Sequence, residues 1–432
     1  MYVNNNITLL NHFEMRNYKQ IFLVSFLCVF IYSCSERARN NLNDNYYVSI
    51  RDFNVLPENS PQTNKKNLQE AINWASESGT ALFVDPSEEP YPIDGGIILK
   101  KNVSLIGVHG PTPRGTIKSN QKGTPVGSVF SITDKMNVFI TVESATQIKG
   151  IQFWYPEQTI KDPFKIIPYP ATIQSSKTSS TQGVFLSCLT FYGEYLAMDF
   201  NSDPNYICEL MTFEHCYGYP LSGEFIRIDY CYDIPRLLHC HVNPAVQRFI
   251  GGQYSPAVVD AVIANKTFAY SINHTDNAQM IDIFTFGTYG GIYLGGDTYG
   301  QLTNFNLDCV TVGIHKKGNN TFNRNWQIAQ GSIIANTGED VENIHPIIIE
   351  GEGHTSFSNV ESFSGPNPAL TTVSENQSWD FMIIKGDEKT TVSLFGCRMR
   401  NYVSNHPFTI QNNKAIVYAN GCLDKNESFF SY

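Results

Sequence analysis

Two short stretches, ELMTFEHCYGYPL at residues 209–221 and RLLHCHVNPA at 236–245, decide the fold prediction because they share one internal layout. Each alternates apolar and polar residues over a few positions, which is typical of a β-strand with one buried face. Each then runs into a turn containing proline with glycine or asparagine. We interpret the pair as two consecutive turns of a repeating β-structure.

Similar strand-like pieces recur along the chain: IKGIQFWY, FLSCLTFYG, MIDIFTFG, LTNFNLDCVTV, SFSNVESFSG, TTVSLFGCRM and KAIVYANG. Their equivalent apolar positions follow one another at irregular intervals; Leu189, Met211 and Leu238 are separated by 22 and 27 residues. Segments of this length suit one rung of a β-solenoid that stacks on its neighbour. A β-sandwich also has many short strands, but it gives no reason for repeats of similar layout. The sequence therefore predicts an all-β solenoid.

One helix is predicted, near the start, in NLQEAINWASESG (67–79). Its apolar residues recur at helical spacing, Thr63 or Asn64 is the expected cap at its start, and Gly79 is expected to end it. Beyond residue 80 we find no further helical pattern. The Pro-, Ser- and Asn-rich segments 155–182 and 243–279 are predicted to be loops at rung corners.

The order of elements over residues 46–110 resembles the N-terminal module of the pectate lyase superfamily: YVSIRDFNVL, NLQEAINWA, SGTALFVDPSEEPYPI and ILKKNVSLIG. The usual glycine-rich stretch has become DFNVLPENS (52–60), and the usual Pro-Gly turn is the acidic DPSEEPYP (85–92). The resemblance implies a right-handed parallel β-helix over residues 46–425, in which 46–110 form a cap module whose helix covers the first rung. The phrases GIQFWYPEQ, PYPATIQ and HVNPA also resemble members of this superfamily from carbohydrate-degrading bacteria.

Residues 15–34, MRNYKQIFLVSFLCVFIYSC, have a basic start, an apolar run and a terminal cysteine. This pattern predicts a secretory signal. Its ending resembles a bacterial lipobox, so Cys34 is the expected lipidation site; an ordinary signal peptide with an incidental cysteine is the alternative. Because the signal reads as complete from Met15, residues 1–14 are open to interpretation as a mis-started segment. We expect an exported protein that is lipid-anchored to a bacterial membrane, on the periplasmic face or the cell surface.

Charged residues make up 16% of the chain, and its net charge of −10 argues against a nucleic-acid partner. Eight cysteines follow Cys34 without CxxC spacing, which argues against a metal site made from them. Cys216 and Cys240 lie in apolar strands and are expected to be buried free thiols, with disulfides as the alternative. Phosphate-binding glycine loops, HExxH, EF-hand and GxSxG patterns are absent from the sequence.

The strand pattern places a set of polar residues on one outer face. If the pairs Leu189/Phe191, Met211/Phe213 and Leu238/Cys240 point inward, their alternate neighbours point outward. These outward residues are Thr190, Tyr192, Thr212, Glu214, His239 and His241, joined by Asp282 and Asp308 from later rungs. Strands stack roughly 4.8 Å apart, so side chains one and two rungs apart bracket the carboxyl separations of about 5–9.5 Å that glycoside hydrolysis uses.

The resulting hypothesis is a glycoside hydrolase that cleaves an extended polysaccharide by two-carboxylate acid/base chemistry. The predicted catalytic residues are Glu214, Asp229, Asp282, Asp308 and His241, and the predicted substrate-binding residues are Tyr192, His239, Tyr217 and Trp154. The aromatic members offer flat apolar faces to sugar rings. Solvated surface positions explain single outward Glu or His residues equally well.

Two alternatives stay open. A polysaccharide lyase would abstract a proton beside a uronate and would need calcium or arginine to neutralise charge, with Arg227 and Arg236 as the nearest candidates. An acidic protein repels a polyuronate unless calcium intervenes. The other alternative is a non-catalytic glycan-binding surface lipoprotein. The hydrolase needs no cofactor.

Overall fold

The computed structural model describes residues 47–108, 124–160, 164–243, 249–250, 256–318, 325–336, 344–362, 380–400, 402 and 406–432. The predicted signal segment and Cys34 lie outside these residues. Residues Ser49–Tyr432 form one compact unit. Among the described residues, no helix has the length and apolar character needed to cross a membrane.

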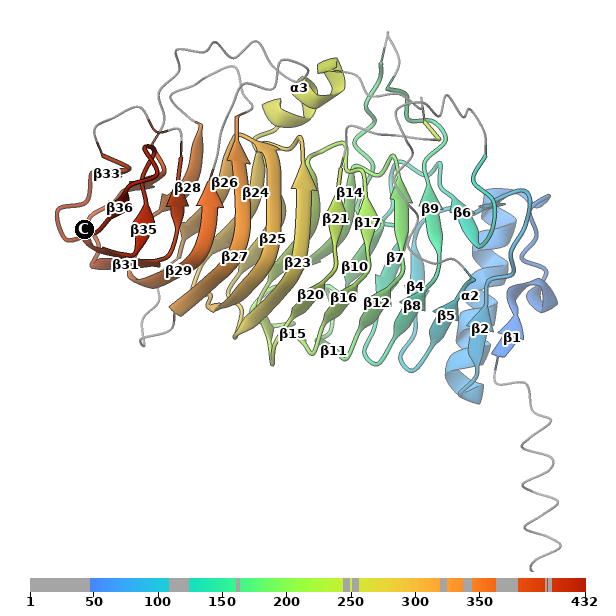
Figure 1. Ribbon diagram of the computed structural model, residues 1–432. Helices are drawn as coiled ribbons and strands as arrows, with labels where there is room; N and C mark the ends of the chain where they lie inside the picture. The colour runs from blue at the N-terminus through green and yellow to red at the C-terminus, as the bar shows by residue number, and fades with distance from the viewer. Residues whose placement is uncertain are drawn as a thin grey trace, which may run out of the picture. The chain divides into compact units, whose positions relative to one another are not determined.

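Most strands belong to two long sheets, with a third sheet of three short strands at one corner (Figure 1). The 11-stranded sheet contains β4(Ile97–Leu99), β7(Ile140–Val142), β10(Ile173–Ser175), β14(Leu196–Asn201), β18(Glu224–Asp229), β22(Phe268–Asn273), β24(Gly290–Gly295), β26(Val312–Lys317), β28(His345–Ile349), β30(Met382–Ile384) and β33(Phe408–Ile410). The three-stranded sheet contains β11(Thr181–Gln182), β15(Cys208–Glu209) and β19(Cys231–Tyr232).

The 22-stranded sheet carries two columns of strands that meet at a bend and merge into long strands in the later rungs. Its strands are β1(Tyr47–Ser49), β2(Ala81–Phe83), β3(Tyr91–Pro92), β5(Ser104–Ile106), β6(Val129–Ser131), β8(Gln147–Lys149), β9(Gln152–Trp154), β12(Phe185–Ser187), β13(Thr190–Tyr192), β16(Thr212–Glu214), β17(Tyr217–Gly218), β20(Arg236–Leu238), β21(His241–Val242), β23(Ala278–Phe286), β25(Gly300–Val310), β27(Asn325–Ala335), β29(Gly353–Ser362), β31(Thr390–Phe395), β32(Arg398–Met399), β34(Ile416–Asn420), β35(Cys422–Leu423) and β36(Phe429–Phe430).

The strands of successive rungs pair in parallel, as β12, β16, β20 and β23 do in turn. Their register aligns Leu186, Phe213, Leu237 and Met280 in one inward column, and all four are fully buried. The prediction of a right-handed parallel β-helix is confirmed. One detail of the predicted register is wrong. Leu237, not Leu238, points inward, because His239 has a positive φ and interrupts the strict alternation between Leu238 and Cys240.

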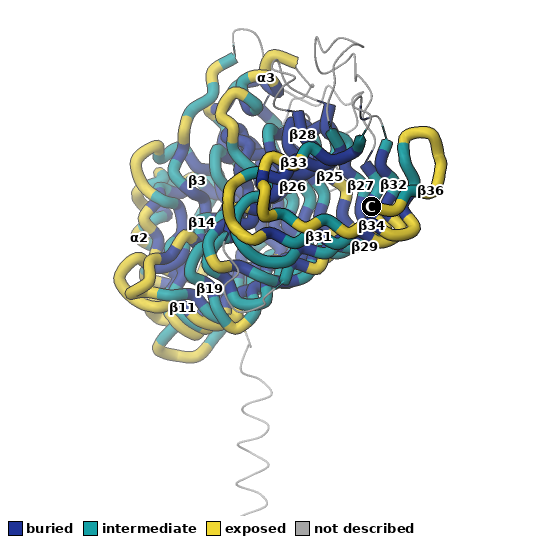
Figure 2. The backbone as a smooth tube through the Cα atoms, turned by 90° about the vertical axis from the view of Figure 1, so that its left-hand side faces the viewer, coloured by how far each residue is buried: buried dark blue, intermediate teal, exposed yellow. Residues whose placement is uncertain are grey.

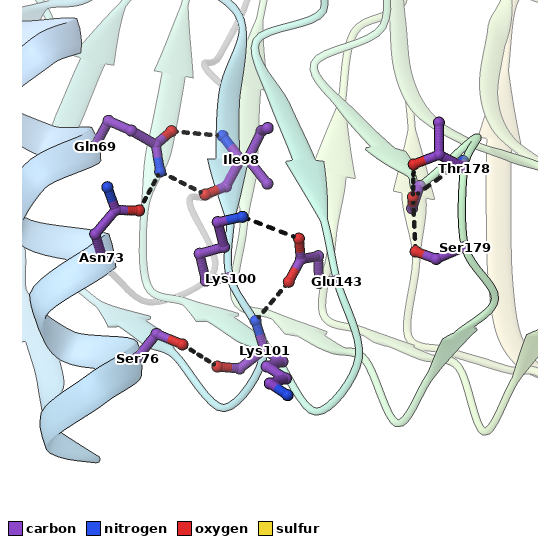
Figure 3. A network of polar contacts seen from close by, with 10 residues as sticks. Gln69, Asn73, Ser76, Ile98, Lys100, Lys101, Glu143, Thr178 and Ser179 are labelled. Carbon is purple, nitrogen blue, oxygen red and sulfur yellow. Dashed lines mark hydrogen bonds and ion pairs between the residues drawn. The ribbon is translucent and has the colours of Figure 1, made fainter.

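The cap helix α2(Pro61–Ser78) closes the first rung, as predicted, by pairing with the backbone of the edge strand β4 (Figure 3). The Gln69 amide accepts a hydrogen bond from Ile98 N at 2.9 Å and donates one to Ile98 O at 3.0 Å. Lower down, Ser76 Oγ donates to Lys101 O at 3.0 Å. These bonds satisfy groups that an uncovered edge would offer to another chain. The helix begins earlier than expected, with Ser60 rather than Thr63 or Asn64 as its cap, and ends at Gly79 as predicted.

Buried residues run along the stacked strands, and exposed residues gather at the turns (Figure 2). The interior holds aromatic stacks such as Phe153 on Phe191, whose ring centroids are 5.0 Å apart. Cys216 and Cys240 occupy one inward column as buried free thiols, as predicted. All eight cysteines in the described part of the chain are free.

The two segments predicted to be loops contain regular structure. Residues 155–182 include β10 and β11, and residues 243–279 include β22 and the helix α3(Pro256–Ala264). The helix contradicts the expectation that none follows residue 80. Its sequence, PAVVDAVIA, is apolar nearly all round, so it lacks the amphipathic period that marks a surface helix. It buries Val258 and Val262 in a small cluster with Leu221.

Candidate functional site

A bend in the 22-stranded sheet organises the candidate site. In each rung the chain passes from the first strand column to the second through one residue with positive φ. Seven consecutive rungs use a residue other than glycine here, at φ of 50° to 55°: Cys188, His215, His239, Asp282, Asn304, Gln330 and Asn359. We call these seven residues the bend column. Positive φ is uncommon outside glycine and costs free energy, although Asn, Asp and His tolerate it best.

The bend column forms a ladder of polar contacts across its middle rungs. The rings of His215 and His239 stack with centroids 4.6 Å apart and an interplanar angle of 11°. His239 Nδ1 lies 2.8 Å from Asp282 Oδ2. Asn304 Nδ2 donates to Asp282 Oδ1 at 3.4 Å. Because a carboxylate only accepts, Nδ1 of His239 carries the proton in this pair, and Nε2 is left as the basic nitrogen.

A second column, two residues further along each strand, is aromatic in the same rungs. The His241 ring lies between Tyr217, at 5.5 Å, and Phe284, at 4.4 Å, and both pairs are stacked. Burial raises the pKa of Tyr217, and the negative charge of Asp282 acts in the same direction. This environment makes His241 a member of a stacked aromatic strip that runs beside the His239–Asp282 pair.

A groove of about 380 Å³ continues both columns into the later rungs. Its lining residues are Asp282, Ile283, Phe284, Asn304, Phe305, Asn306, Gln330, Gly331, Ser332, Asn359 and Glu361. The bend residue and the residue two positions later form its two sides, since residues i and i+2 of a strand share a face. Glycine at position 331 lets the Phe305 ring pack against the backbone of the next rung, because a Cβ there would lie 2.2 Å from that ring.

Glu214 lies on the same outer face, immediately before the bend residue of its rung. Its rung neighbours are Ser187 and Leu238, and Ile281 follows one rung later. Glu214 and Asp282 are thus two rungs and one residue apart, which puts their Cα atoms about 10 Å from each other. The sequence placed Glu214 and His239 at equivalent strand positions, and this is wrong. Leu238 lies beside Glu214, and His239 occupies the bend one residue later.

Two predicted carboxylates do not join this group. Asp308 lies in the second arm of β25, four residues beyond Asn304, and so about 13 Å along the strand from the bend column. Asp229 lies in β18 of the 11-stranded sheet, where its Oδ1 is 2.7 Å from His274 Nδ1. Burial raises the pKa of Asp229, and the His274 hydrogen bond opposes that rise. The predicted set of four carboxylates is therefore divided between two sheets.

The predicted binding aromatics are also dispersed. Tyr192 is 2% exposed and meets the Phe249 ring edge-on at 4.8 Å, so the expectation of an exposed stacking face is wrong. Trp154 donates from Nε1 to Phe249 O at 3.3 Å. It lines a separate pocket of about 440 Å³ with Pro57, Glu58, Glu89, Pro90, Pro92, Thr124 and Ser131. Its rung is four below that of Asp282, about 19 Å along the stack.

The sequence interpretation missed His215, Asn304, Gln330, Asn359 and Phe284. A signal for the bend residues existed: each stands alone between two strand-like pairs, as in FEHCY, TNFNL and SNVES. Of the two arginines considered for a lyase, Arg227 pairs with Glu224 at 2.6 Å on the 11-stranded sheet. Arg236 faces outward on the same sheet as Glu214, two residues before Leu238.

No group of three or more His, Cys, Asp or Glu side chains within the described ranges is arranged to hold a metal ion. The Cα atoms of Glu214 and Asp282, about 10 Å apart, are too distant for their carboxylates to be read as one calcium site.

Comparisons with known proteins bear on the fold. No family model matches the sequence, and neither does any curated protein. Among solved structures, the Agl-KA catalytic domain matches at 11% identity and a TM-score of 0.51, covering 86% of this chain and 68% of that one. The A-module of Azotobacter vinelandii mannuronan C-5 epimerase AlgE6 matches at 9% identity and 0.46, covering 87% and 98%.

A tailspike protein double mutant of E. coli bacteriophage HK620 matches at 11% identity and a TM-score of 0.49, covering 86% of this chain and 67% of that one. At identities this low a likeness supports fold alone. The likeness to the Agl-KA catalytic domain agrees with the parallel β-helix fold.

Proposed function

We propose that the protein acts on an extended polysaccharide and cleaves it as a glycoside hydrolase. The observation that carries this proposal is the placement of Glu214 and the Asp282–His239 pair on one outer face, with His239 one rung and Asp282 two rungs from Glu214. The adjoining aromatic strip of Tyr217, His241 and Phe284, whose rings stack on one another, adds an aromatic surface beside this pair.

In this mechanism Glu214 donates its proton to the glycosidic oxygen of the leaving group. Asp282 holds the His239 ring so that Nε2 accepts a proton from the attacking water. Water forms the new bond to the anomeric carbon as the glycosidic bond breaks. His239 lies one rung and one residue from Glu214, about 6 Å between Cα atoms, so the proton donor and the base lie on neighbouring rungs of one face.

Arg236 supports a lyase as the second candidate. It lies one rung and two residues from Glu214, about 8 Å between Cα atoms, and faces outward. In a lyase, His239 would abstract the proton beside a uronate carboxylate that Arg236 neutralises. Loss of the leaving group would then form a carbon–carbon double bond.

The purified full-length protein is incubated with neutral and uronate-containing polysaccharides, and each reaction is read for new reducing ends and for ultraviolet absorbance of unsaturated sugars. Reducing ends without absorbance are expected and indicate hydrolysis. Glu214→Gln should lower the rate at least about 100-fold, while the control Glu209→Gln, in the three-stranded sheet, should not. Both signals together would identify the lyase. Silence on every substrate would contradict cleavage and leave a glycan-binding protein.

Export and anchoring through a lipid on Cys34 are also proposed, on the signal-like sequence alone. Metabolic labelling of expressing cells with a fatty acid analogue tests this. We expect label on the wild-type protein and none on Cys34→Ala; label on both, or on neither, would reject lipidation at this residue.

A further inference from the structure

The groove in the later rungs differs from the Glu214 region in its chemistry. Three exposed amides from successive rungs line one side: Asn304, Gln330 and Asn359. Asn306 and Ser332 line the other side in the same rungs. Amides and hydroxyls both donate and accept hydrogen bonds, so these ladders match ligands that carry hydroxyl groups.

The charged residues of the groove favour neutral ligands over anionic ones. Its two charged lining residues, Asp282 and Glu361, are both carboxylates. Arg400 NH1 lies 3.4 Å from Glu361 Oε1, but neither lysine nor arginine lines the groove among the described residues. A chain of uronates would meet like charges at both ends, which costs affinity.

The geometry of the groove fits a chain laid along the stack. Its amides repeat every rung, at about 4.8 Å, close to the length of one pyranose in an extended chain. Its sides are formed by residues i and i+2, about 6–7 Å apart; the floor between them is apolar at Ile283 and Phe305, and Phe284 adds an aromatic ring to one side. A sugar ring placed there would cover an aromatic surface while its hydroxyls reach the amides.

We propose that this groove binds a neutral, unbranched glycan lengthwise, one sugar per rung, and that the Asn304–Gln330–Asn359 ladder recognises its hydroxyls. This inference rests on the proposed function in one respect: the bound glycan is taken to run from the groove toward Asp282 and Glu214, the proposed site of cleavage. It adds a substrate class, neutral rather than uronate, which the carboxylates of Glu214 and Asp282 do not specify by themselves.

Affinity electrophoresis of the full-length protein tests the inference in gels that contain neutral glucan, mannan or xylan, or else polygalacturonate or alginate. We expect retardation in at least one neutral glycan and none in the polyuronates. Gln330→Glu should weaken that binding about fivefold or more, because it removes the amide donor and adds a charge. The matched control Gln327→Glu changes an exposed glutamine of the same strand outside the groove and should bind as wild type.

Binding to polyuronates alone, equal effects of the two variants, or no binding to any neutral glycan would overturn the inference. The same gels run with Glu214→Gln measure binding by a protein that should not cleave, so the groove assignment is tested independently of the proposed cleavage. Binding to a neutral glycan without cleavage by wild type would reject the hydrolase and keep the groove assignment. Cleavage of a polyuronate would reject the groove assignment and keep a cleaving enzyme.

Discussion

Two of the corners at which the described rungs turn through positive φ are built differently. The bend column keeps Cys, His, Asp, Asn or Gln at this position over seven rungs. The second corner follows the strands of the 11-stranded sheet and starts with Tyr230 and His274, but continues with Gly296, Gly351 and Gly386. Glycine meets the backbone requirement without the strain that other residues bear. The bend column therefore bears, over seven rungs, a backbone strain that the later rungs of the second corner avoid.

Each corner also holds one Asp–His pair, which makes the contrast sharper. His239 and Asp282 have side chains 42% and 52% exposed, open to a ligand. His274 and Asp229 are 37% and 20% exposed, and the His274 ring lies flat on Tyr230 at 4.5 Å. The same pair of residue types thus faces a groove in one place and a packed turn in the other.

The largest expected effect compares the two histidines. His239→Asn should reduce polysaccharide cleavage about 1,000-fold, since it removes the proposed base. His274→Asn should leave cleavage within about twofold and lower the free energy of unfolding by about 1 kcal/mol, through the lost hydrogen bond to Asp229. Asparagine suits both positions because it tolerates positive φ. Initial rates and urea unfolding check both variants, and equal losses of activity would erase the distinction between the corners.

A second prediction concerns Lys316, which is 1% exposed and anchors the second corner. Its Nζ donates to the carbonyl oxygens of Gly318, Glu350 and Glu352. Burial lowers the pKa of this amine to about 8 from 10.5. Between those values the unfolded chain binds more protons than the folded one, so stability rises with pH.

The free energy of unfolding of wild type should therefore increase relative to Lys316→Met by up to about 3 kcal/mol between pH 8 and 10.5. Below pH 8 the difference between the two proteins should stay constant, because the lysine is then protonated in both states. Urea unfolding of both proteins at several pH values measures this. A constant difference across the whole range would mean that the amine is not desolvated.

A third prediction tests the glycines of the second corner. A Cβ at Gly296 would lie 2.7 Å from His274 Nε2, in addition to the strain of positive φ. Gly296→Ala should lower the free energy of unfolding by about 2 kcal/mol. Gly421, at the end of the bend series, also has positive φ but has no atom within 4 Å of its Cβ position. Gly421→Ala should cost about 1 kcal/mol, and equal costs would show that contact with His274 adds nothing.

The smallest effect is expected at Asn359 in the bend column. Asn359→Gly relieves the backbone strain but gives the unfolded chain more freedom, so stability should change by less than about 1 kcal/mol. Asn306→Gly, in the extended arm of β25, should destabilise by about 1 kcal/mol. Urea midpoints measure both. A large loss for Asn359→Gly would show that the side chain, rather than a ligand, holds this corner together.

Much of the fold was readable in the sequence because it depends on local pattern. Apolar alternation predicted the strands, and the order of YVSIRDFNVL, helix and ILKKNVSLIG predicted the cap. The exact register was not readable. Leu237 and Leu238 are both apolar, and only stacking against Phe213 and Met280 decides which one points inward.

The candidate site shows the same division. Glu214, Asp282, His239 and His241 were predicted from strand phase and Tyr217 as an aromatic stacking residue, and the structure brings all five to one face. Asp229 and Asp308 were grouped with them because phase along a strand says nothing of which sheet, or which arm of a bent sheet, a strand joins. The amide ladder was missed because a single αL residue breaks the period of two on which the prediction rests.

The sequence by itself determined that this chain forms stacked β-rungs under a helical cap, since alternation and helical spacing are local properties of neighbouring residues. Only the tertiary structure decided which polar residues meet. His215, His239, Asp282 and Asn304 are far apart in the chain and become neighbours because parallel stacking aligns the bends of successive rungs. That alignment depends on how each rung packs its interior, and no single segment contains it.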